Sequence, residues 1–172
     1  MSYKVVDNFL NATEFKHLQS LIIGNTDFNW NITTNVANRG TDKDYDNNLE
    51  DQLWNWYGIH PVYATIPLSP HFETIAGIFC SKFDIKSLIR IKINFYPYTT
   101  KIQEHAKHQD FSFSHSAAVF SLNTCDGFTR MANGDKVDSV ENRIVFFDAS
   151  EYHNSSTTSN QKGRYNINFN YF

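Results

Sequence analysis

Residues 164–172 read Arg-Tyr-Asn-Ile-Asn-Phe-Asn-Tyr-Phe, and residues 88–97 read Leu-Ile-Arg-Ile-Lys-Ile-Asn-Phe-Tyr-Pro. In both stretches polar and apolar side chains alternate, which predicts β-strands. Because successive side chains of a strand point to opposite faces, each strand has one apolar and one polar face. The polar faces carry Arg90, Lys92, Asn94 and Tyr96 on the earlier strand and Arg164, Asn166, Asn168 and Asn170 on the last one.

Two helices are predicted in the first half of the chain. Asn11 and Glu14 have the spacing of a capping box, which predicts a helix over about 12–23. Ser69 followed by Pro70 predicts the start of a second helix that runs to about Phe83. Helices followed by strands predict a mainly β fold with N-terminal helices packed on one sheet. Strands are expected at 3–9, 28–36, 88–97, 108–111, 115–123, 127–131, 135–138, 142–148 and 164–171.

The two polar strand faces have two interpretations. Each strand could be an ordinary half-buried strand whose polar side faces water. If the amphipathic helices cover the apolar faces instead, the polar side chains point into a barrel or between two sheets. Burying arginine and asparagine costs free energy unless they bind something, so this second arrangement predicts a ligand site.

A candidate metal site begins at His108-Gln109-Asp110, the single H-x-D sequence of the chain. On an extended segment the first and third side chains project to the same side, so both can reach one ion. His153 follows an apolar run, and Arg164 comes eleven positions later. Two histidines and one carboxylate form the facial triad of non-haem Fe(II) oxygenases, and a nearby arginine can hold a dicarboxylate.

The ordered pattern resembles the 2-oxoglutarate- and Fe(II)-dependent dioxygenases, especially the prolyl 4-hydroxylase-like branch, which includes forms encoded by bacterial viruses. The resemblance runs over roughly 88–172 and implies a double-stranded β-helix, a jelly roll with helices packed on one sheet. The whole chain, 1–172, is then one domain. Residues 1–87 supply helical support and a lid loop at Asn38–Glu50, and residues 88–172 form the catalytic core.

The resemblance also implies roles for individual residues. His108, Asp110 and His153 would hold Fe(II), and Arg164 would bind the C5 carboxylate of 2-oxoglutarate. Tyr96 and Asn168 are expected to contact the cosubstrate, and Lys92, Asn94 and Asn170 the substrate. The family frequently has a tyrosine where this chain has Ser121, so either water or Asn166 replaces that phenol, or the cosubstrate lies differently. His105 and His115 flank the site without a partner at ligand spacing.

The activity implied is an oxygenase that couples oxidative decarboxylation of 2-oxoglutarate, with O2, to hydroxylation of a substrate C–H. The branch favours a prolyl or other residue of a peptide or protein, with a small molecule as the other option. One alternative is a catalytically inactive jelly-roll binding module or virion component, which should have lost a metal ligand or Arg164. Another is a cupin-like metal enzyme without 2-oxoglutarate, which should carry an H-x-H pair.

Composition narrows the partners and the compartment. The formal charge is -3 and no basic run occurs, which argues against duplex nucleic acid. Trp30, Trp54 and Trp56 are expected in the core, although they could stack on bases. No signal peptide or apolar stretch of membrane-spanning length is recognisable, and only two cysteines occur. A cytoplasmic protein is therefore expected, in the host cell if the gene is viral, whereas the sequence leaves the oligomeric state open.

Overall fold

The computed structural model describes residues 3–36 and 52–172, so the expected lid at Asn38–Glu50 lies outside the described residues. The described chain is mainly β-structure with two helices, α1 (Ala12–Ile22) and α2 (Phe72–Phe79). No helix in these two ranges is long and apolar enough to cross a membrane. The strands are β1 (Lys4–Val6), β2 (Asn31–Thr33), β3 (Tyr57–Ala64), β4 (Ile66–Pro67), β5 (Leu88–Pro97), β6 (Ser116–Ser121), β7 (Phe128–Arg130), β8 (Lys136–Asp138), β9 (Ile144–Asp148), β10 (Asn154–Ser155) and β11 (Gly163–Tyr171).

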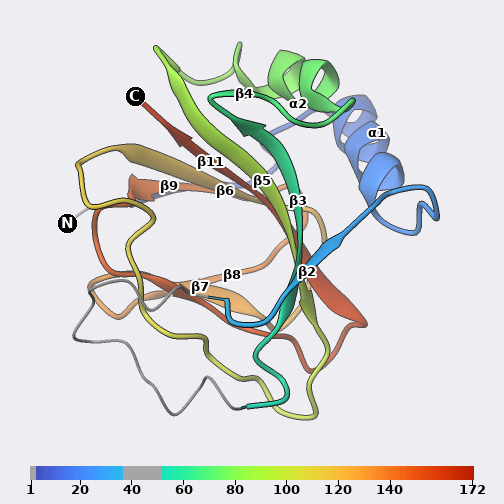
Figure 1. The fold of residues 1–172 in the computed structure, drawn as a ribbon, viewed down its shortest axis with the longest axis vertical. Coiled ribbons are helices and arrows are strands. Elements are labelled where there is room, and N and C mark those ends of the chain that lie inside the picture. The colour runs from blue at the N-terminus through green and yellow to red at the C-terminus, as the bar shows by residue number, and fades with distance from the viewer. Residues whose placement is uncertain (1–2, 37–51) are drawn as a thin grey trace.

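The strands form two antiparallel sheets. The large sheet has the order β1-β9-β6-β11-β5-β3-β2, with β4 paired to β3, and the small sheet has the order β10-β7-β8. In Figure 1 the two helices lie on one side of the large sheet, and β7 and β8 lie on the other. This arrangement of two antiparallel sheets is consistent with the jelly roll that the resemblance implied.

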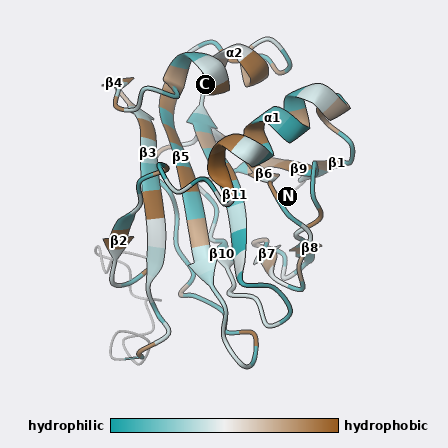
Figure 2. Cartoon of the chain, turned by 90° about the vertical axis from the view of Figure 1, so that its right-hand side faces the viewer, coloured by the Kyte–Doolittle hydropathy of each residue, from teal (hydrophilic) through white to brown (hydrophobic). Residues whose placement is uncertain are grey.

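The main hydrophobic core lies between the helices and the large sheet. Figure 2 shows α1 and α2 next to β5, β6 and β11. The core joins Phe15, Leu18 and Ile22 of α1 and Ile75 and Phe79 of α2 to Ile91, Ile93, Phe120, Ile167 and Phe169 of the sheet. The alternation predicted for β5 and β11 is confirmed, because their apolar face is the one in this core.

The polar face of the same strands points away from the helices and is largely buried. Arg164 is 1% exposed, and the asparagines of β11 are buried with it. The register between the two strands pairs Arg164 with Tyr96 and Asn168 with Lys92. The interpretation as an inward-facing polar surface is therefore correct, and only its Arg90 and Lys92 end is partly exposed.

The predicted helix starts differ in outcome. At α1 the Asn11 side chain accepts hydrogen bonds from the backbone N–H of Thr13 (3.0 Å) and Glu14 (2.9 Å), so the predicted cap is confirmed. The predicted start of α2 is wrong, since His71 is the residue before its first turn. Ser69 Oγ accepts from the backbone N–H of His71 (3.1 Å) and lies 2.7 Å from His60 Nε2, so Ser69 closes a turn and does not cap the helix. The helix also ends at Phe79, short of Phe83.

Three strand predictions need correction. β3 was not predicted, and it contains Pro61 at a register shift, where the missing N–H of proline is tolerated. The expected strand at 28–36 shortens to β2, because Phe28 and Trp30 pack into the core region before the strand begins. The run at 108–111 is no strand; it makes one isolated antiparallel bridge between His108 and His153.

Candidate metal centre

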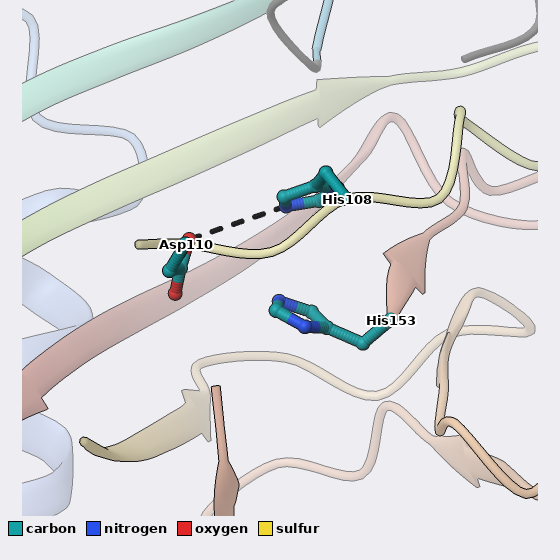
Figure 3. A group of neighbouring side chains, drawn as sticks. All are labelled: His108, Asp110 and His153. Carbon is teal, nitrogen blue, oxygen red and sulfur yellow. Dashed lines mark ion pairs between the residues drawn. The ribbon is translucent and has the colours of Figure 1, made fainter. Parts of the chain in front are cut away.

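The backbone itself brings the two histidines of the H-x-D…H pattern together. The N–H of His108 donates to the carbonyl of His153 (2.9 Å), and the N–H of His153 donates to the carbonyl of His108 (3.0 Å). The two imidazole centroids are consequently 4.7 Å apart. Figure 3 shows the side chains of His108, Asp110 and His153 projecting toward one another from these two segments.

Asp110 is fixed by backbone and side-chain bonds. Its N–H donates to the carbonyl of Ala149 (3.1 Å). Its carboxylate, 3% exposed, accepts from Arg90 Nη2 (2.9 Å) and from Asn170 Nδ2 (2.8 Å). Burial acts to raise the pKa of Asp110, but nearby positive charge, above all Lys92, outweighs burial and holds that pKa well below its usual value. Asp110 is therefore an anion at neutral pH.

Both histidines present the nitrogen that a metal ion needs. Nδ1 of His108 donates to the carbonyl of Ala106 (3.2 Å), and Nδ1 of His153 donates to the carbonyl of Glu151 (2.9 Å). These bonds place the proton on Nδ1 and leave the Nε2 lone pair free. Burial lowers the pKa of His153 and, together with the neighbouring His153, lowers that of His108 to about 4. Both rings are thus neutral at pH 7.

The donor set fits a divalent metal ion. One ligand atom from each of His108, Asp110 and His153 lies within 4.8 Å of the others. Two imidazole nitrogens and one carboxylate oxygen are the donor set of the non-haem Fe(II) facial triad, which leaves further coordination positions open. The geometry can therefore support metal-dependent chemistry.

A cavity between the two sheets adjoins the three residues. Two of the amide oxygens that line it, Asn94 Oδ1 and Asn168 Oδ1, are buried without a hydrogen-bond partner in the described chain. Such atoms are available to donors of a bound molecule. The lining comprises Lys92, Asn94, Tyr96, His108, Asp110, Val119, Thr129, His153, Ser155, Asn166 and Asn168.

Arg164 lies behind the Tyr96 and Thr129 end of this cavity. Its guanidinium donates to Ser139 Oγ (2.6 Å), Thr129 Oγ1 (2.8 Å) and the carbonyl of Ser156 (3.3 Å), and it lies 5.4 Å from the Tyr96 ring centroid. Within residues 3–36 and 52–172, no carboxylate forms an ion pair with Arg164. A buried cation without a counter-ion is costly, so this end of the cavity suits the carboxylate of a ligand.

Of the other residues expected at the site, Asn166 and Asn168 line the cavity, whereas Ser121 and Asn170 do not. Ser121 is buried on β6 opposite Asn166, outside the cavity lining. Asn166 Oδ1 accepts from Asn94 Nδ2 (2.9 Å). Asn168 lies at the Asp110 end, with Nδ2 3.5 Å from the carboxylate, and Asn170 holds Asp110 directly. Asn168 and Asn170 are therefore placed to orient the carboxylate.

The two flanking histidines are buried within the fold. The His105 ring packs against Tyr96 at a tilt, with a centroid distance of 5.1 Å, and burial followed by the charge of Arg164 lowers the pKa of His105 to about 3. His115 Nε2 lies 3.2 Å from Asn170 Nδ2, the amide that holds Asp110. Each therefore touches a residue of the candidate site, and neither is one of the three clustered ligands.

Arg90 and Thr129 are among the residues at the site that were not assigned a role from the sequence. Arg90 pairs with Asp110, and Thr129 lies between Arg164 and the cavity. Arg90 could have been noticed, because the alternation of β5 already places it on the polar face. Thr129 belongs to a three-residue strand of the small sheet, which carries no pattern of its own.

Comparisons with known proteins give matches among solved structures. No family model matches the chain, and no curated protein matches it. A prolyl hydroxylase from Trichoplax adhaerens, solved with a peptide of the hypoxia inducible factor oxygen degradation domain, has a TM-score of 0.63 at 14% identity over 99% of this chain and 83% of that one. A 2OG-Fe(II) oxygenase family oxidoreductase from Burkholderia pseudomallei has a TM-score of 0.64 at 13% identity, covering 98% and 84%.

A third solved structure is viral. The collagen prolyl hydroxylase of Paramecium Bursaria Chlorella virus-1, solved with 2OG, has a TM-score of 0.56 at 12% identity, covering 99% of this chain and 95% of that one. At these identities the likeness establishes the fold. The chain therefore has the fold of prolyl hydroxylases and related 2OG-Fe(II) oxygenases.

Proposed function

We propose that the protein is an Fe(II)- and 2-oxoglutarate-dependent oxygenase that hydroxylates a C–H bond of a peptide or protein, at a prolyl or another residue. The observation that carries this proposal is the convergence of the His108, Asp110 and His153 ligand atoms within 4.8 Å. The buried Arg164 without a carboxylate partner in the described chain supports the cosubstrate assignment.

His108, Asp110 and His153 are the residues that would hold the metal. Bound Fe(II), with 2-oxoglutarate and O2, supplies the oxidising chemistry, in which substrate C–H, O2 and 2-oxoglutarate give substrate C–OH, succinate and CO2. The protein contributes orientation: the backbone pair between His108 and His153 sets the two nitrogens, and Arg90 and Asn170 set the carboxylate.

Arg164 binds the C5 carboxylate of 2-oxoglutarate in this proposal. A guanidinium has five N–H groups, and three bonds to Ser139, Thr129 and Ser156 fix its plane while N–H groups remain for a carboxylate. Tyr96 and Thr129 contact the guanidinium and line the same cavity as the proposed metal ligands. They are the side chains of the chain best placed to contact the middle of the cosubstrate.

A peptide or protein substrate is supported by the fold neighbours, one of which was solved with a bound peptide. We also propose that the domain has a supporting part and a catalytic part. The segment before β5 supplies both helices, and the segment from β5 to β11 supplies the three clustered residues and Arg164. The inactive-module alternative predicts neither specific Fe(II) binding nor succinate formation.

The test is a succinate-release assay with Fe(II), 2-oxoglutarate and a peptide library, run beside calorimetric metal titration. We expect the wild type to release succinate, and His108→Ala and Asp110→Ala to fall to the level of a reaction without protein. The control is Lys16→Ala, an exposed change in α1. Unchanged turnover or unchanged metal affinity in both ligand variants would contradict the proposed function.

A further inference from the structure

The Asp110 carboxylate accepts hydrogen bonds on both of its oxygens. Oδ1 accepts from Arg90 Nη2 (2.9 Å), and Oδ2 accepts from Asn170 Nδ2 (2.8 Å). A longer bond of 3.5 Å joins Asn168 Nδ2 to Oδ2. A carboxylate has about four lone-pair positions, two on each oxygen. Donors of the described chain therefore occupy both positions of Oδ2 and one position of Oδ1, and the second position of Oδ1 stays open.

The open position belongs to an oxygen that lies next to a histidine ligand. Oδ1 is 4.0 Å from Nε2 of His108, and the ligand atoms of His108, Asp110 and His153 lie within 4.8 Å of one another. A protein carboxylate can bind a metal ion through one oxygen or through both. The donors around Asp110 favour binding through Oδ1 alone.

The Asn170 amide that covers Oδ2 is itself held in one orientation. Its oxygen accepts from Arg90 Nε (3.1 Å), and its nitrogen lies 3.2 Å from Nε2 of His115. His115 is buried, and its Nδ1 lies 2.8 Å from the carbonyl oxygen of Phe113, which can only accept. The proton of the ring is therefore on Nδ1, and Nε2 accepts from the Asn170 amide.

The opposite orientation of this amide is unfavourable at two contacts. It would place the amide oxygen of Asn170 against the Asp110 carboxylate and against the lone pair of His115 Nε2. Asn170 is fully buried, so water cannot compensate for the lost bonds. His115 and Arg90 thus keep the donor side of the amide on Asp110.

We propose that Asn170 and His115 are positioning residues that restrict Asp110 to a single metal-binding oxygen. Asn170 covers Oδ2 directly, and His115 acts through Asn170 by accepting the second N–H of its amide. These roles rest on the proposed function, in which the metal needs open coordination positions for 2-oxoglutarate and O2. A second oxygen of Asp110 on the metal would take one of those positions.

The test counts the water molecules on Mn(II), a divalent probe that accepts oxygen and nitrogen ligands. In water labelled with a magnetic oxygen isotope, each bound water broadens the electron paramagnetic resonance of the ion. Asn170→Leu replaces the amide by a side chain of similar size without a donor. We expect it to carry one water fewer than the wild type, because Oδ2 is released to the metal. Equal water counts in the two proteins would overturn the proposal.

Two variants at His115 separate its acceptor from its ring. His115→Phe keeps the ring contacts with Phe111 and Phe113 but removes the acceptor, so the water count should fall as in Asn170→Leu. His115→Gln keeps an acceptor oxygen and should have the water count of the wild type. If the two His115 variants behave alike, the role assigned to this residue is wrong.

The matched control is His60→Phe. His60 is also a buried histidine, and its ring nitrogens lie within hydrogen-bond distance of Asn29 and Ser69, away from the candidate metal centre. This variant should lose stability in urea unfolding and keep the water count of the wild type. A water count that falls in His60→Phe would show that any buried histidine change disturbs the metal, and the proposal would fail.

Turnover gives a second readout. In Asn170→Leu and His115→Phe the kcat for succinate release should fall at least about tenfold, whereas the KM for 2-oxoglutarate should change less than about threefold. A rise in KM without a fall in kcat would contradict the positioning role. Failure of the proposed function looks different, because the wild type would then release no succinate while the water counts still decide the role of Asn170. A wild type that binds no Mn(II) would overturn both.

Discussion

Arg164 combines two properties that rarely occur together in one side chain. It is among the largest fully buried residues of the described chain, and its bonds go to two hydroxyl groups and one carbonyl, all of them uncharged. The desolvation of a buried ion costs several kcal/mol, which three neutral hydrogen bonds offset only in part. In the proposed function a carboxylate of 2-oxoglutarate supplies the missing counter-charge, so the affinity for 2-oxoglutarate should depend strongly on Arg164.

Replacement of Arg164 tests that link. We expect Arg164→Met to weaken 2-oxoglutarate binding by roughly 100-fold, about 3 kcal/mol, because a desolvated charge pair is lost. The 2-oxoglutarate affinity of Arg164→Lys should lie between those of the wild type and Arg164→Met, because lysine keeps the positive charge but lacks the planar guanidinium. Calorimetric titration with 2-oxoglutarate, beside a separate metal titration, measures both. A larger effect on metal affinity than on 2-oxoglutarate affinity would refute the assigned role.

Residue types and their order along the chain were enough to select the three residues that cluster in the structure. His108, Asp110 and His153 could be chosen without knowing any register. The partners of Asp110 could not be found this way. Arg90 and Asn170 both bond to its carboxylate because they pair with each other in the register of β5 and β11 and because Asp110 lies next to this pair. Both are features of the tertiary structure that local sequence does not reveal.

At the scale of elements, period-two strands were the most predictable part of the fold. β5 and β11 alternate without interruption, so their two faces follow from sequence alone. β3 was missed because Pro61 and Gly58 interrupt its pattern, although pairing with β5 overrides both. α2 begins late because Ser69 bonds to His60 of β3, a contact that no local pattern records.

Two glycine variants separate tight packing from helix propensity. A Cβ at Gly127 would lie 2.7 Å from the carbonyl oxygen of Thr157 and 2.8 Å from Cδ of Arg164, so Gly127→Ala must displace backbone or the guanidinium stem. We expect a loss of about 1–3 kcal/mol in the free energy of unfolding, together with weaker 2-oxoglutarate binding. Urea unfolding and calorimetry measure the two effects.

The matched control for this change lies in α2. A Cβ at Gly77 would meet nothing within 4 Å, so Gly77→Ala should stabilise the protein by up to about 1 kcal/mol through helix propensity. Its affinity for 2-oxoglutarate should equal that of the wild type. If Gly127→Ala proves as harmless as Gly77→Ala, the close packing behind Arg164 is not needed.

At the scale of the whole molecule, the space between the two sheets is rich in neutral imidazoles. Burial lowers the pKa of His153 in this space and that of His60 at the edge of the helical core. Burial and the charge of Arg164 lower the pKa of His105 to about 3. Each group has a lower pKa in the folded protein than in the unfolded chain, where histidine titrates near 6.5.

The sign of the resulting pH dependence follows from proton linkage. Below pH 6.5 the unfolded chain binds protons that the folded protein does not bind, so stability falls as the pH falls from 6.5 toward 3. At pH 5 His105 alone should cost about 2 kcal/mol relative to pH 7. Urea unfolding of the metal-free protein between pH 7 and pH 5 measures the loss.

Non-titrating variants identify the residue responsible. Between pH 7 and pH 5 the free energy of unfolding of His105→Gln and of His105→Phe should fall by about 2 kcal/mol less than that of the wild type, whatever their stability at pH 7. Comparing the slopes of stability against pH, and not the absolute stabilities, removes the effect of the lost ring contact with Tyr96. Parallel slopes in wild type and variants would show that His105 is not the acid-sensitive group.

The reciprocal backbone bonds between His108 and His153 have a consequence for ion exchange. Both nitrogen donors are spaced by peptide geometry before any ion arrives, and the carboxylate is anchored by its own neighbours. If the three residues hold a cation as proposed, its binding should require little ordering of these loops, because the donors are already in place.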